Sequence, residues 1–334
     1  MSVVPGGVEL QGDLVDAAGL ALWSRCAARV LVRIARLPAA SLQQLEQELR
    51  KLDLAPYLHR GQPAKVKASL HNARFKRADV AAAKVASALK LSTSGRRTPL
   101  ELMLRVQGRE ATLSIDASGL LHRRGYRQAT AKAPLRENLA ASVLRAAGWR
   151  PGVPLADPMC GSGSFSIEAA QMSQERAPGL DLKLPVVQLP SFPANTWDTL
   201  CREARRGERP QQGWFHSADR DPGAIRATTS NAARAGVELH PLQQDIGVEV
   251  AAPPGPGLVV LNPPYGVRVA ANVQLASLYH RMGEALRRDY PGWRVAAIGP
   301  DKALAGRLAK GIEELTSFKT GGLQVRLWIG ELPR

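Results

Sequence analysis

A regular alternation of short apolar segments and helical segments, from about residue 126 onward, constrains the fold more than any other feature. Strands are predicted at 153–156, 214–218, 258–261, 295–299 and 324–329. Helices are predicted before and between them at 135–147, 222–235, 273–288 and 302–310. Strands that alternate with helices bury both faces of a mostly parallel sheet. This part of the chain is therefore predicted to be an α/β, doubly wound, Rossmann-like domain.

The N-terminal part mixes helices and strands without that rhythm, which is typical of a smaller α+β domain. Helices are predicted at 13–24, 41–52 and 78–91, the second with Ser41 as its N-cap. Strands are predicted at 29–37, 64–70, 100–106 and 111–115. We place the domain limits at 1–125 and 126–334. The proline-rich stretch 176–213 is predicted to be an insertion over one edge of the second domain's sheet, with a helix at 196–206.

Positive charge is concentrated in the first part of the chain. Residues 1–150 hold 25 basic and 11 acidic side chains, whereas residues 151–334 hold 20 and 18. An isolated cluster of basic residues would be explained by a solvated face. A positive charge that is concentrated in one part of the chain is better explained by binding to a phosphate backbone. The residues predicted to grip RNA are Lys65, Lys67, Arg74, Lys76 and Arg77 in one group, and Arg123, Arg124 and Arg127 in a second. The second group is also compatible with a basic hinge.

Other patterns narrow the class of protein. The three cysteines are scattered and no CxxC, HxxxH or HExxH spacing occurs, so we predict neither a disulfide framework nor a metal site. No run of 18 apolar residues and no signal peptide is present. The sequence is thus predicted to be a cytoplasmic protein with no membrane contact.

The segment 155–170 contains the first pattern that points to chemistry. A short strand ends at Asp157, a turn with Gly161 and Gly163 follows, and a helix then begins. Glycines allow a backbone to approach a ligand closely and to adopt positive φ, and a helix start favours a ligand's charged end. The spacing D-x-x-C-G-S-G resembles the first motif of class I S-adenosylmethionine methyltransferases. Cys160 could in principle be a nucleophile, but its place inside this loop favours a packing role.

A second pattern follows the apolar strand 258–261, where the chain reads Asn262-Pro263-Pro264-Tyr265-Gly266. Two successive prolines stiffen the loop and remove two donors. The Asn262 side-chain oxygen and a backbone carbonyl can then accept hydrogen bonds from one exocyclic amino group, while Tyr265 stacks on the base. A rigid structural turn is the alternative.

Two acids at predicted strand ends complete the candidate site. Asp219 ends the strand 214–218, where a carboxylate suits a ribose diol. Asp245 follows a short predicted strand at 239–244 and could accept a hydrogen bond from an adenine amine. Asp221 is interpreted as the N-cap of the next helix.

With these residues identified, the chain resembles the THUMP-domain RNA methyltransferases of the bacterial 23S rRNA guanine-N2 type. The resemblance rests on Asp116–Gly119 with Leu121–Arg127, on Ala133–Ala140, and on the loops Asp157–Gly163 and Asn262–Gly266. It implies a shortened ferredoxin-like part, a THUMP domain and a class I methyltransferase domain. It also implies S-adenosylmethionine as cofactor and RNA, most readily 23S rRNA, as substrate.

The same resemblance assigns roles to individual residues. Catalysis would involve Asn262, Pro263, Pro264 and Tyr265. The cofactor would be bound by Asp157, Met159, Cys160, Gly161, Gly163, Asp219, Asp245 and Asn262. Three alternatives stay open: a tRNA substrate, methylation of adenine N6, and a non-catalytic RNA-binding or ribosome-assembly protein.

Overall fold

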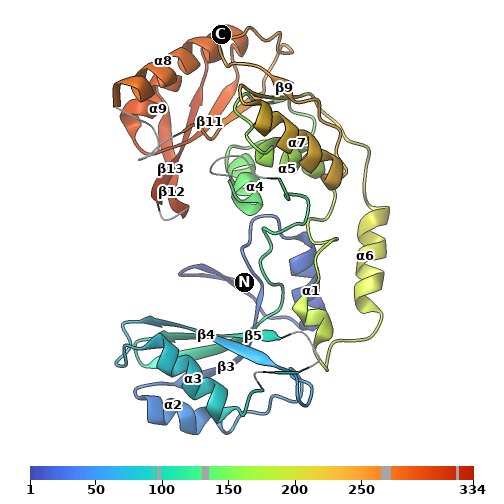
Figure 1. Cartoon of the computed structure of the whole chain (residues 1–334), viewed down its shortest axis with the longest axis vertical. Coiled ribbons are helices and arrows are strands. Elements are labelled where there is room, and N and C mark those ends of the chain that lie inside the picture. Colours follow the sequence, from blue (N-terminus) through green and yellow to red (C-terminus); the bar gives the residue numbers. More distant parts are fainter. Residues whose placement is uncertain (93, 96–98, 130–134, 265–271, 321–322) are drawn as a thin grey trace. The chain divides into compact units, whose positions relative to one another are not determined.

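The computed structural model describes residues 1–92, 94–95, 99–129, 135–264, 272–320 and 323–334 (Figure 1). The chain forms two compact units. The first contains Met1–Leu121 and Gly179–Glu203, and the second contains His122–Pro178 and Ala204–Arg334. Each unit has its own sheet and core, so each is described by itself.

The first unit is built on a four-stranded sheet with the order β3-β6-β5-β4, in which only β4 and β5 run parallel. Its strands are β3 (Leu31–Pro38), β4 (Ala64–His71), β5 (Leu100–Gln107) and β6 (Glu110–Asp116). Its helices are α1 (Leu14–Trp23), α2 (Leu42–Leu49) and α3 (Ala78–Ala88). Helices α2 and α3 cover one face of the sheet (Figure 1).

Local sequence signals explain these elements well. The Ser41 side chain accepts a hydrogen bond from Gln44 N at 3.1 Å, which confirms the predicted N-cap of α2. Leu45 and Leu49, one helical turn apart, are fully buried. A short hairpin of β1 (Ser2–Val4) and β2 (Gly7–Glu9) was not predicted, because three-residue strands carry too little periodic signal.

The segment 179–203 corrects one prediction. It packs in the first unit, whereas the flanking residues 176–178 and 204–213 of the predicted insertion belong to the second unit. Gly179 N donates to Leu22 O at 2.9 Å, and Val186 N donates to Ala117 O at 2.9 Å. A Cβ on Gly179 would lie 2.6 Å from Ala21 O, so only glycine permits this approach. The segment also carries η1 (Pro185–Gln188) and the start of α6 (Thr196–Arg206), the latter at its predicted bounds.

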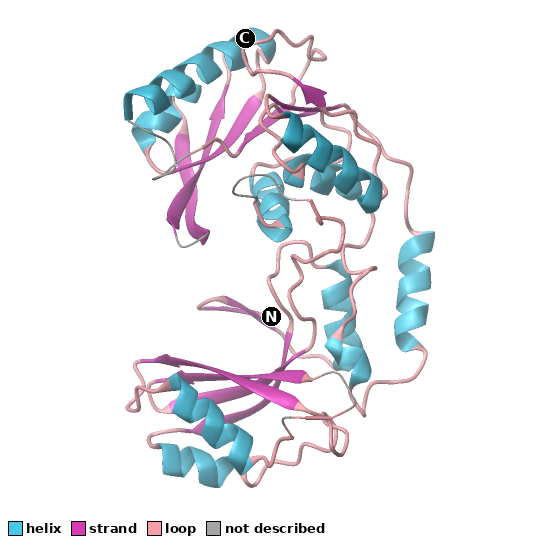
Figure 2. Ribbon diagram, in the orientation of Figure 1, coloured by secondary structure: helices cyan, strands magenta, loops and turns pink. Residues whose placement is uncertain are grey.

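The second unit is built on a seven-stranded sheet with the order β12-β13-β11-β10-β7-β8-β9. Figure 2 draws all strands in magenta and all helices in cyan. Its strands are β7 (Leu155–Asp157), β8 (Phe215–Asp219), β9 (Leu242–Gln243), β10 (Leu258–Leu261), β11 (Arg294–Gly299), β12 (Glu313–Thr320) and β13 (Leu323–Glu331). Strands β9, β8, β7, β10 and β11 are parallel, and β13 runs antiparallel to both β11 and β12. The predicted doubly wound, mostly parallel sheet is confirmed.

Helices cover both faces of this sheet. One apolar core packs α4 (Glu137–Ala146) and α5 (Ser164–Ser173) on the sheet, with α7 (Pro222–Ala235) beside α5. The other core lies under α8 (Asn272–Asp289) and α9 (Lys302–Leu308). None of the helices that the structure describes has the length and apolarity to cross a bilayer.

The order of the strands reverses between β7 and β10, which are hydrogen-bonded neighbours although 100 residues separate them. In doubly wound sheets ligands bind outside the carboxyl ends of the strands at this switch point. A ligand site is therefore expected at the carboxyl ends of β7, β8 and β10.

Candidate cofactor and catalytic site

Three polar residues predicted from the sequence meet at this edge of the sheet. Asp157 is the last residue of β7, Asp219 is the last residue of the neighbouring β8, and Asn262 directly follows β10. Because parallel strands end at the same edge, residues far apart in the sequence become neighbours here. The sheet topology therefore supplies a common location for the predicted carboxylate and amide groups.

The loop from Cys160 to Gly163 is held in a fixed shape by the helix α7. Gly161 and Gly163 adopt φ of +57° and +83°, a region that favours glycine. The Thr228 hydroxyl donates to Gly161 O at 2.9 Å, and Asn231 Nδ2 donates to Ser162 O at 3.0 Å. Sequence reasoning missed Thr228 and Asn231; both are fully buried polar residues three positions apart on one helix face.

Asp219 connects this loop to β8. One carboxylate oxygen accepts from Gly161 N at 3.0 Å, and the other accepts from Asp221 N at 2.9 Å. Each oxygen keeps a further lone pair for a ligand donor. Asp221 caps α7 by accepting from Gly223 N at 2.7 Å, so the N-cap interpretation of that residue is confirmed.

Asp157 is a buried carboxylic acid with an incomplete set of partners. Its side chain is 1% exposed, and Oδ2 accepts from the Ser166 hydroxyl at 3.1 Å, which in turn accepts from Ser217 at 2.7 Å. Oδ1 is buried and has no hydrogen-bond partner among the described residues. Burial, with a smaller effect from the nearby Asp219, raises the pKa of Asp157 to about 7. Such a group is suited to a cationic ligand that supplies the missing donor.

Cys160 has the properties of a packing residue. It is 7% exposed, and its sulfur lies 3.7 Å from the Thr228 hydroxyl. Burial and the neighbouring Asp157 raise the pKa of its thiol well above the ordinary value, so a thiolate is disfavoured. These observations favour the packing interpretation over a cysteine nucleophile.

A pocket of about 390 Å³, open to solvent, adjoins the loop. The predicted residues Met159, Asp219, Asp245 and Pro264 all line it, and Asp245 accepts from Gly247 N at 3.0 Å. Five further lining residues were not predicted, namely Pro158, Arg220, Gln244, Ile246 and Leu278. Each lies next to a predicted residue or on a helix. The sequence alone does not show that these side chains face the pocket.

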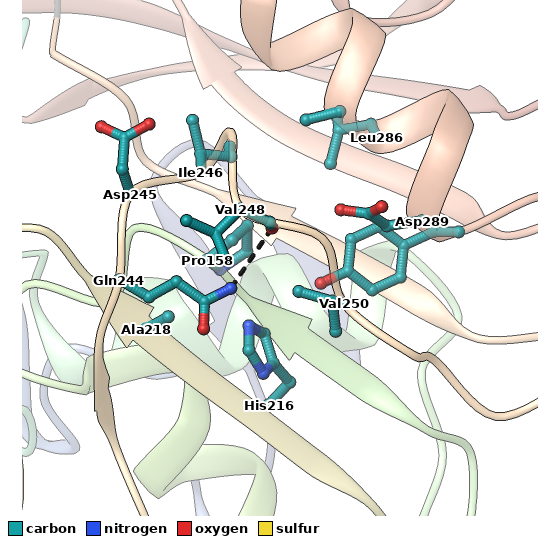
Figure 3. A pocket seen from close by; sticks show the side chains of 12 residues that line it. Pro158, His216, Ala218, Gln244, Asp245, Ile246, Val248, Val250, Leu286 and Asp289 are labelled. Atoms are coloured by element: carbon teal, nitrogen blue, oxygen red, sulfur yellow. Dashed lines mark hydrogen bonds between the residues drawn. The ribbon is translucent and has the colours of Figure 1, made fainter.

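A second pocket of about 240 Å³ lies beside the first and shares Pro158, Gln244, Asp245 and Ile246 with it (Figure 3). Gln244 Nε2 donates to Val248 O at 3.3 Å between two of its lining residues. His216 lines this pocket, and burial lowers the pKa of its imidazole, so the ring stays neutral near pH 7. Of the Asn262–Pro264 segment, Pro264 lines the first pocket and no residue lines the second, so we place the chemistry in the first one.

Asn262 is partly buried, and its Oδ1 is a buried acceptor with no hydrogen-bond partner among the described residues. A buried acceptor that lacks a donor costs about 1–3 kcal/mol, so such atoms call for a ligand. Pro263 behind it is buried, and Pro264 is exposed at the pocket. The predicted stacking residue Tyr265 lies outside the described residues.

Comparison with known proteins adds independent information. Residues 124–324 match the family of RMKL-like methyltransferase domains, and residues 1–31 match the RlmL ferredoxin-like domain. The chain is 36% identical to the ribosomal RNA large subunit methyltransferase K/L of Syntrophotalea carbinolica, over 98% of this chain and 49% of that protein. It is 31% identical to the "Putative RNA methyltransferase slr0064" of Synechocystis sp., over 98% of this chain and 88% of that protein. The chain belongs to the RMKL-like methyltransferase family.

The chain spans about half the length of the Syntrophotalea relative of this family. Among solved structures, a predicted N6-adenine-specific DNA methylase from Listeria monocytogenes superposes with a TM-score of 0.83 at 28% identity, covering 96% of this chain and 87% of that one. The prediction of the family is confirmed, as is that of a ferredoxin-like part followed by a Rossmann-like methyltransferase domain. The THUMP assignment between these parts stays a prediction.

S-adenosylmethionine is the cofactor of this methyltransferase domain, and the described residues fit it. The Asp157 oxygen without a donor suits an ammonium group. The remaining acceptor capacity of Asp219 and Asp245 suits hydroxyl and amino donors, and both residues line the pocket together with Met159, which directly precedes the glycine loop.

The basic residues of the first unit are placed where a phosphate backbone could reach them. Lys65 and Lys67 alternate with inward-facing residues on β4, and Arg74, Lys76 and Arg77 follow it; all five are exposed. Lys67 also pairs with Glu101 at 2.6 Å, and Arg77 pairs with Asp79. These surface pairs are weak, so they leave the lysine and arginine available to a stronger anion.

The second basic group must be corrected. Arg124 is 4% exposed and pairs with Glu168, which is fully buried and also accepts from the Tyr126 hydroxyl at 2.9 Å. Arg127 pairs with the buried Glu137 at 3.0 Å. The burial of Arg124 and its pair with Glu168 contradict the prediction that it contacts RNA, whereas for the partly buried Arg127 that contact stays a prediction. Of the three arginines only Arg123 is exposed.

Proposed function

We propose that this chain transfers a methyl group from S-adenosylmethionine to the exocyclic N2 amine of a guanosine in RNA, with 23S rRNA as the substrate. The observation that carries the proposal is the buried, unpartnered Oδ1 of Asn262. It lies at the carboxyl end of β10, beside the switch point and next to the pocket lined by Asp219 and Pro264. A primary amine has two N–H donors. One would be accepted by the Asn262 oxygen and the other by a backbone carbonyl.

Asn262 acts by orienting the amine. The lone pair of an exocyclic amine is conjugated with the ring, so the amine is a weak nucleophile until its N–H bonds are held in a suitable direction. The Asn262 oxygen and the Pro263 carbonyl would each accept one N–H, which directs the lone pair out of the ring plane. Correct orientation of two reacting groups is worth about 7–11 kcal/mol in favourable cases.

Bound S-adenosylmethionine supplies an electrophilic methyl group on its sulfonium. The chain has no need of a nucleophile of its own, which agrees with the buried, protonated Cys160. It also needs no strong base, because the protonated product amine is acidic and loses its proton to solvent. The rigid Pro263–Pro264 pair would keep the acceptors fixed while the reaction proceeds.

An RNA substrate is supported by the charge of the first unit and by the names of two relatives, a large-subunit rRNA methyltransferase and an RNA methyltransferase. Residues 51–100 carry 11 basic and 2 acidic side chains. Extruding a base from structured RNA costs a few kcal/mol, which phosphate contacts can offset.

Adenine N6 is the second candidate target, because the related Listeria structure is titled an N6-adenine-specific DNA methylase. An adenine amine offers the same two donors to Asn262, so this geometry does not discriminate the two bases. The guanine proposal rests on the residues that resemble the guanine-N2 family.

The test is methylation of unmodified 23S rRNA transcript by purified protein, followed by digestion and mass spectrometry of the nucleosides. We expect N2-methylguanosine. N6-methyladenosine would transfer the proposal to adenine, and modification of tRNA transcript alone would exclude rRNA. With saturating cofactor and RNA, Asn262→Ala should methylate about 10²–10³ times more slowly in a single turnover, because one oriented acceptor is lost. A near wild-type rate would refute the role of Asn262.

A further inference from the structure

We propose that His122, Arg123 and Arg136 form a phosphate-binding site on the methyltransferase unit, which holds the RNA backbone next to the target nucleotide. The inference rests on the proposed function, because it assigns a contact to the same RNA substrate. It differs from the sequence-based prediction, which included Arg124 and Arg127 and left out His122 and Arg136.

The proposal starts from how the structure sorts the arginines near residue 125. Arg124 and Arg127 are turned inward, and each is neutralised by one buried carboxylate, Glu168 or Glu137. These two carboxylates are 0% and 2% exposed, so they are screened from the surface and fully engaged. Neither carboxylate forms an ion pair with another arginine of this segment among the described residues.

Arg123 and Arg136 are the other two arginines of this segment among the residues that the structure describes. Both side chains are exposed, and neither has an ion-pair partner among the residues that the structure describes. Arg127 Nη1 donates to Leu135 O at 2.9 Å, which ties the segment that starts at His122 to the residue directly before Arg136. This contact keeps Arg123 and Arg136, which are 13 residues apart in the sequence, in one region, and the charges of both act on His122.

His122 shows that the region is electropositive. Its imidazole is partly buried, and burial together with the charges of Arg136, Arg123, Arg127 and Arg124 lowers its pKa to about 4. A neutral imidazole can donate one N–H to a phosphate oxygen without adding to the repulsion among the arginines. Arginine forks suit phosphate oxygens because two parallel N–H groups match two oxygens.

The location of this cluster connects it with the reaction. The Ser164 hydroxyl donates to Leu135 O at 3.0 Å, and Ser164 is the first residue of α5 after the glycine loop. Arg136 therefore follows a residue that touches the edge of the cofactor loop. A phosphate held there belongs to a nucleotide close to the one that enters the pocket beside Asn262.

The experiment compares Arg123→Gln/Arg136→Gln with a matched control, Arg145→Gln. Arg145 is an exposed arginine in the last turn of the helix α4 that Arg136 precedes, about 14 Å from Arg136 along the axis. Binding of unmodified 23S rRNA transcript is measured between 50 and 300 mM KCl, roughly the range where phosphate contacts dominate. Binding of S-adenosylhomocysteine and thermal melting are measured on the same variants.

We expect RNA binding to weaken about tenfold for each arginine. The slope of log Kd against log salt should become smaller by about 1.4–1.8 for two lost contacts. Arg145→Gln should bind like the wild type, and His122→Gln should weaken binding less than either arginine variant. Cofactor affinity and melting temperature should stay unchanged in all of them.

Three results would overturn the site. An unchanged salt slope in the double variant would place the phosphate contacts elsewhere. An equal loss in Arg145→Gln would reduce the effect to general surface charge, and weaker S-adenosylhomocysteine binding would assign the cluster to the cofactor's carboxylate. If the wild-type protein neither binds nor methylates the RNA, the proposed function itself fails, and the site fails with it.

Discussion

The ionisation of Asp157 should control both cofactor affinity and the stability of the free protein. The carboxyl group is buried, lacks a donor for Oδ1 among the described residues, and has a pKa of about 7. A cofactor ammonium would favour the ionised form, because it supplies the missing charge-assisted hydrogen bond. Cofactor binding should then release a proton wherever the free enzyme holds Asp157 protonated.

The magnitude follows from the pKa. At pH 6 a group with a pKa of about 7 is about one-tenth ionised, so the affinity should be about five- to tenfold below its maximum. The α-amino group of the cofactor loses its proton with a pKa of about 7.7–8.0, which weakens binding at higher pH. We therefore expect an affinity maximum between about pH 7 and 8.

Stability of the free protein should show the opposite trend. The folded-state pKa of Asp157 is raised above its unfolded value of 3.8, so folding favours the protonated acid. Its contribution is most favourable below about pH 4 and is lost as the pH rises through about 7. The loss amounts to about 4 kcal/mol for a shift of about three pH units. Asp157→Asn should therefore stabilise the free protein at pH 8 while weakening cofactor binding.

Calorimetric titration with S-adenosylhomocysteine between pH 5.5 and 8.5, in two buffers of different ionisation enthalpy, measures both affinity and proton release. Urea denaturation of the wild type and Asp157→Asn at pH 5.5 and pH 8 measures the stability difference. An affinity that stays flat from pH 6 to 7.5, or a pH profile that Asp157→Asn retains, would refute the reasoning.

Three further predictions concern the scaffold and the RNA contact. Gly163→Ala should destabilise the protein by about 1–3 kcal/mol in urea denaturation, because φ is +83° and the new Cβ would lie 2.8 Å from Thr228 Cγ2. Adding Thr228→Ser should recover part of the loss; equal stability of Gly163→Ala and the wild type would contradict the strain. Glu168→Gln should cost about 3–5 kcal/mol, because it removes the buried carboxylate that pairs with the buried Arg124. Glu48→Gln, which breaks a surface pair with Lys51, should have little effect in the same urea denaturation. Replacing three exposed lysines of the first unit, Lys65, Lys67 and Lys76, by Gln should lower the salt slope of RNA binding by about 0.7–0.9 per lost contact without changing cofactor affinity. An unchanged slope would move the RNA grip elsewhere.

Many local features of this protein could be predicted from the sequence. The helix α7 has the predicted bounds 222–235, because Asp221 and Pro222 mark its start and Gly236 marks its end. The strand and loop at Asn262 were also recognisable, since an apolar run followed by two prolines leaves few alternatives. The strand β12 was missed, because its exposed charged residues hide the alternation of an edge strand.

Burial, partners and ionisation were decided only by the tertiary structure. Arg124 has the same side chain as its neighbour Arg123, but a carboxylate 44 residues away turns it into a buried structural group. The segment 179–203 joins the first unit through contacts with residues far earlier in the chain, among them Leu22 and Ala117. The sequence determined which chemical groups and local elements this chain has. Their environment depends on long-range packing, because desolvation and ion pairing act between residues that only the fold brings together.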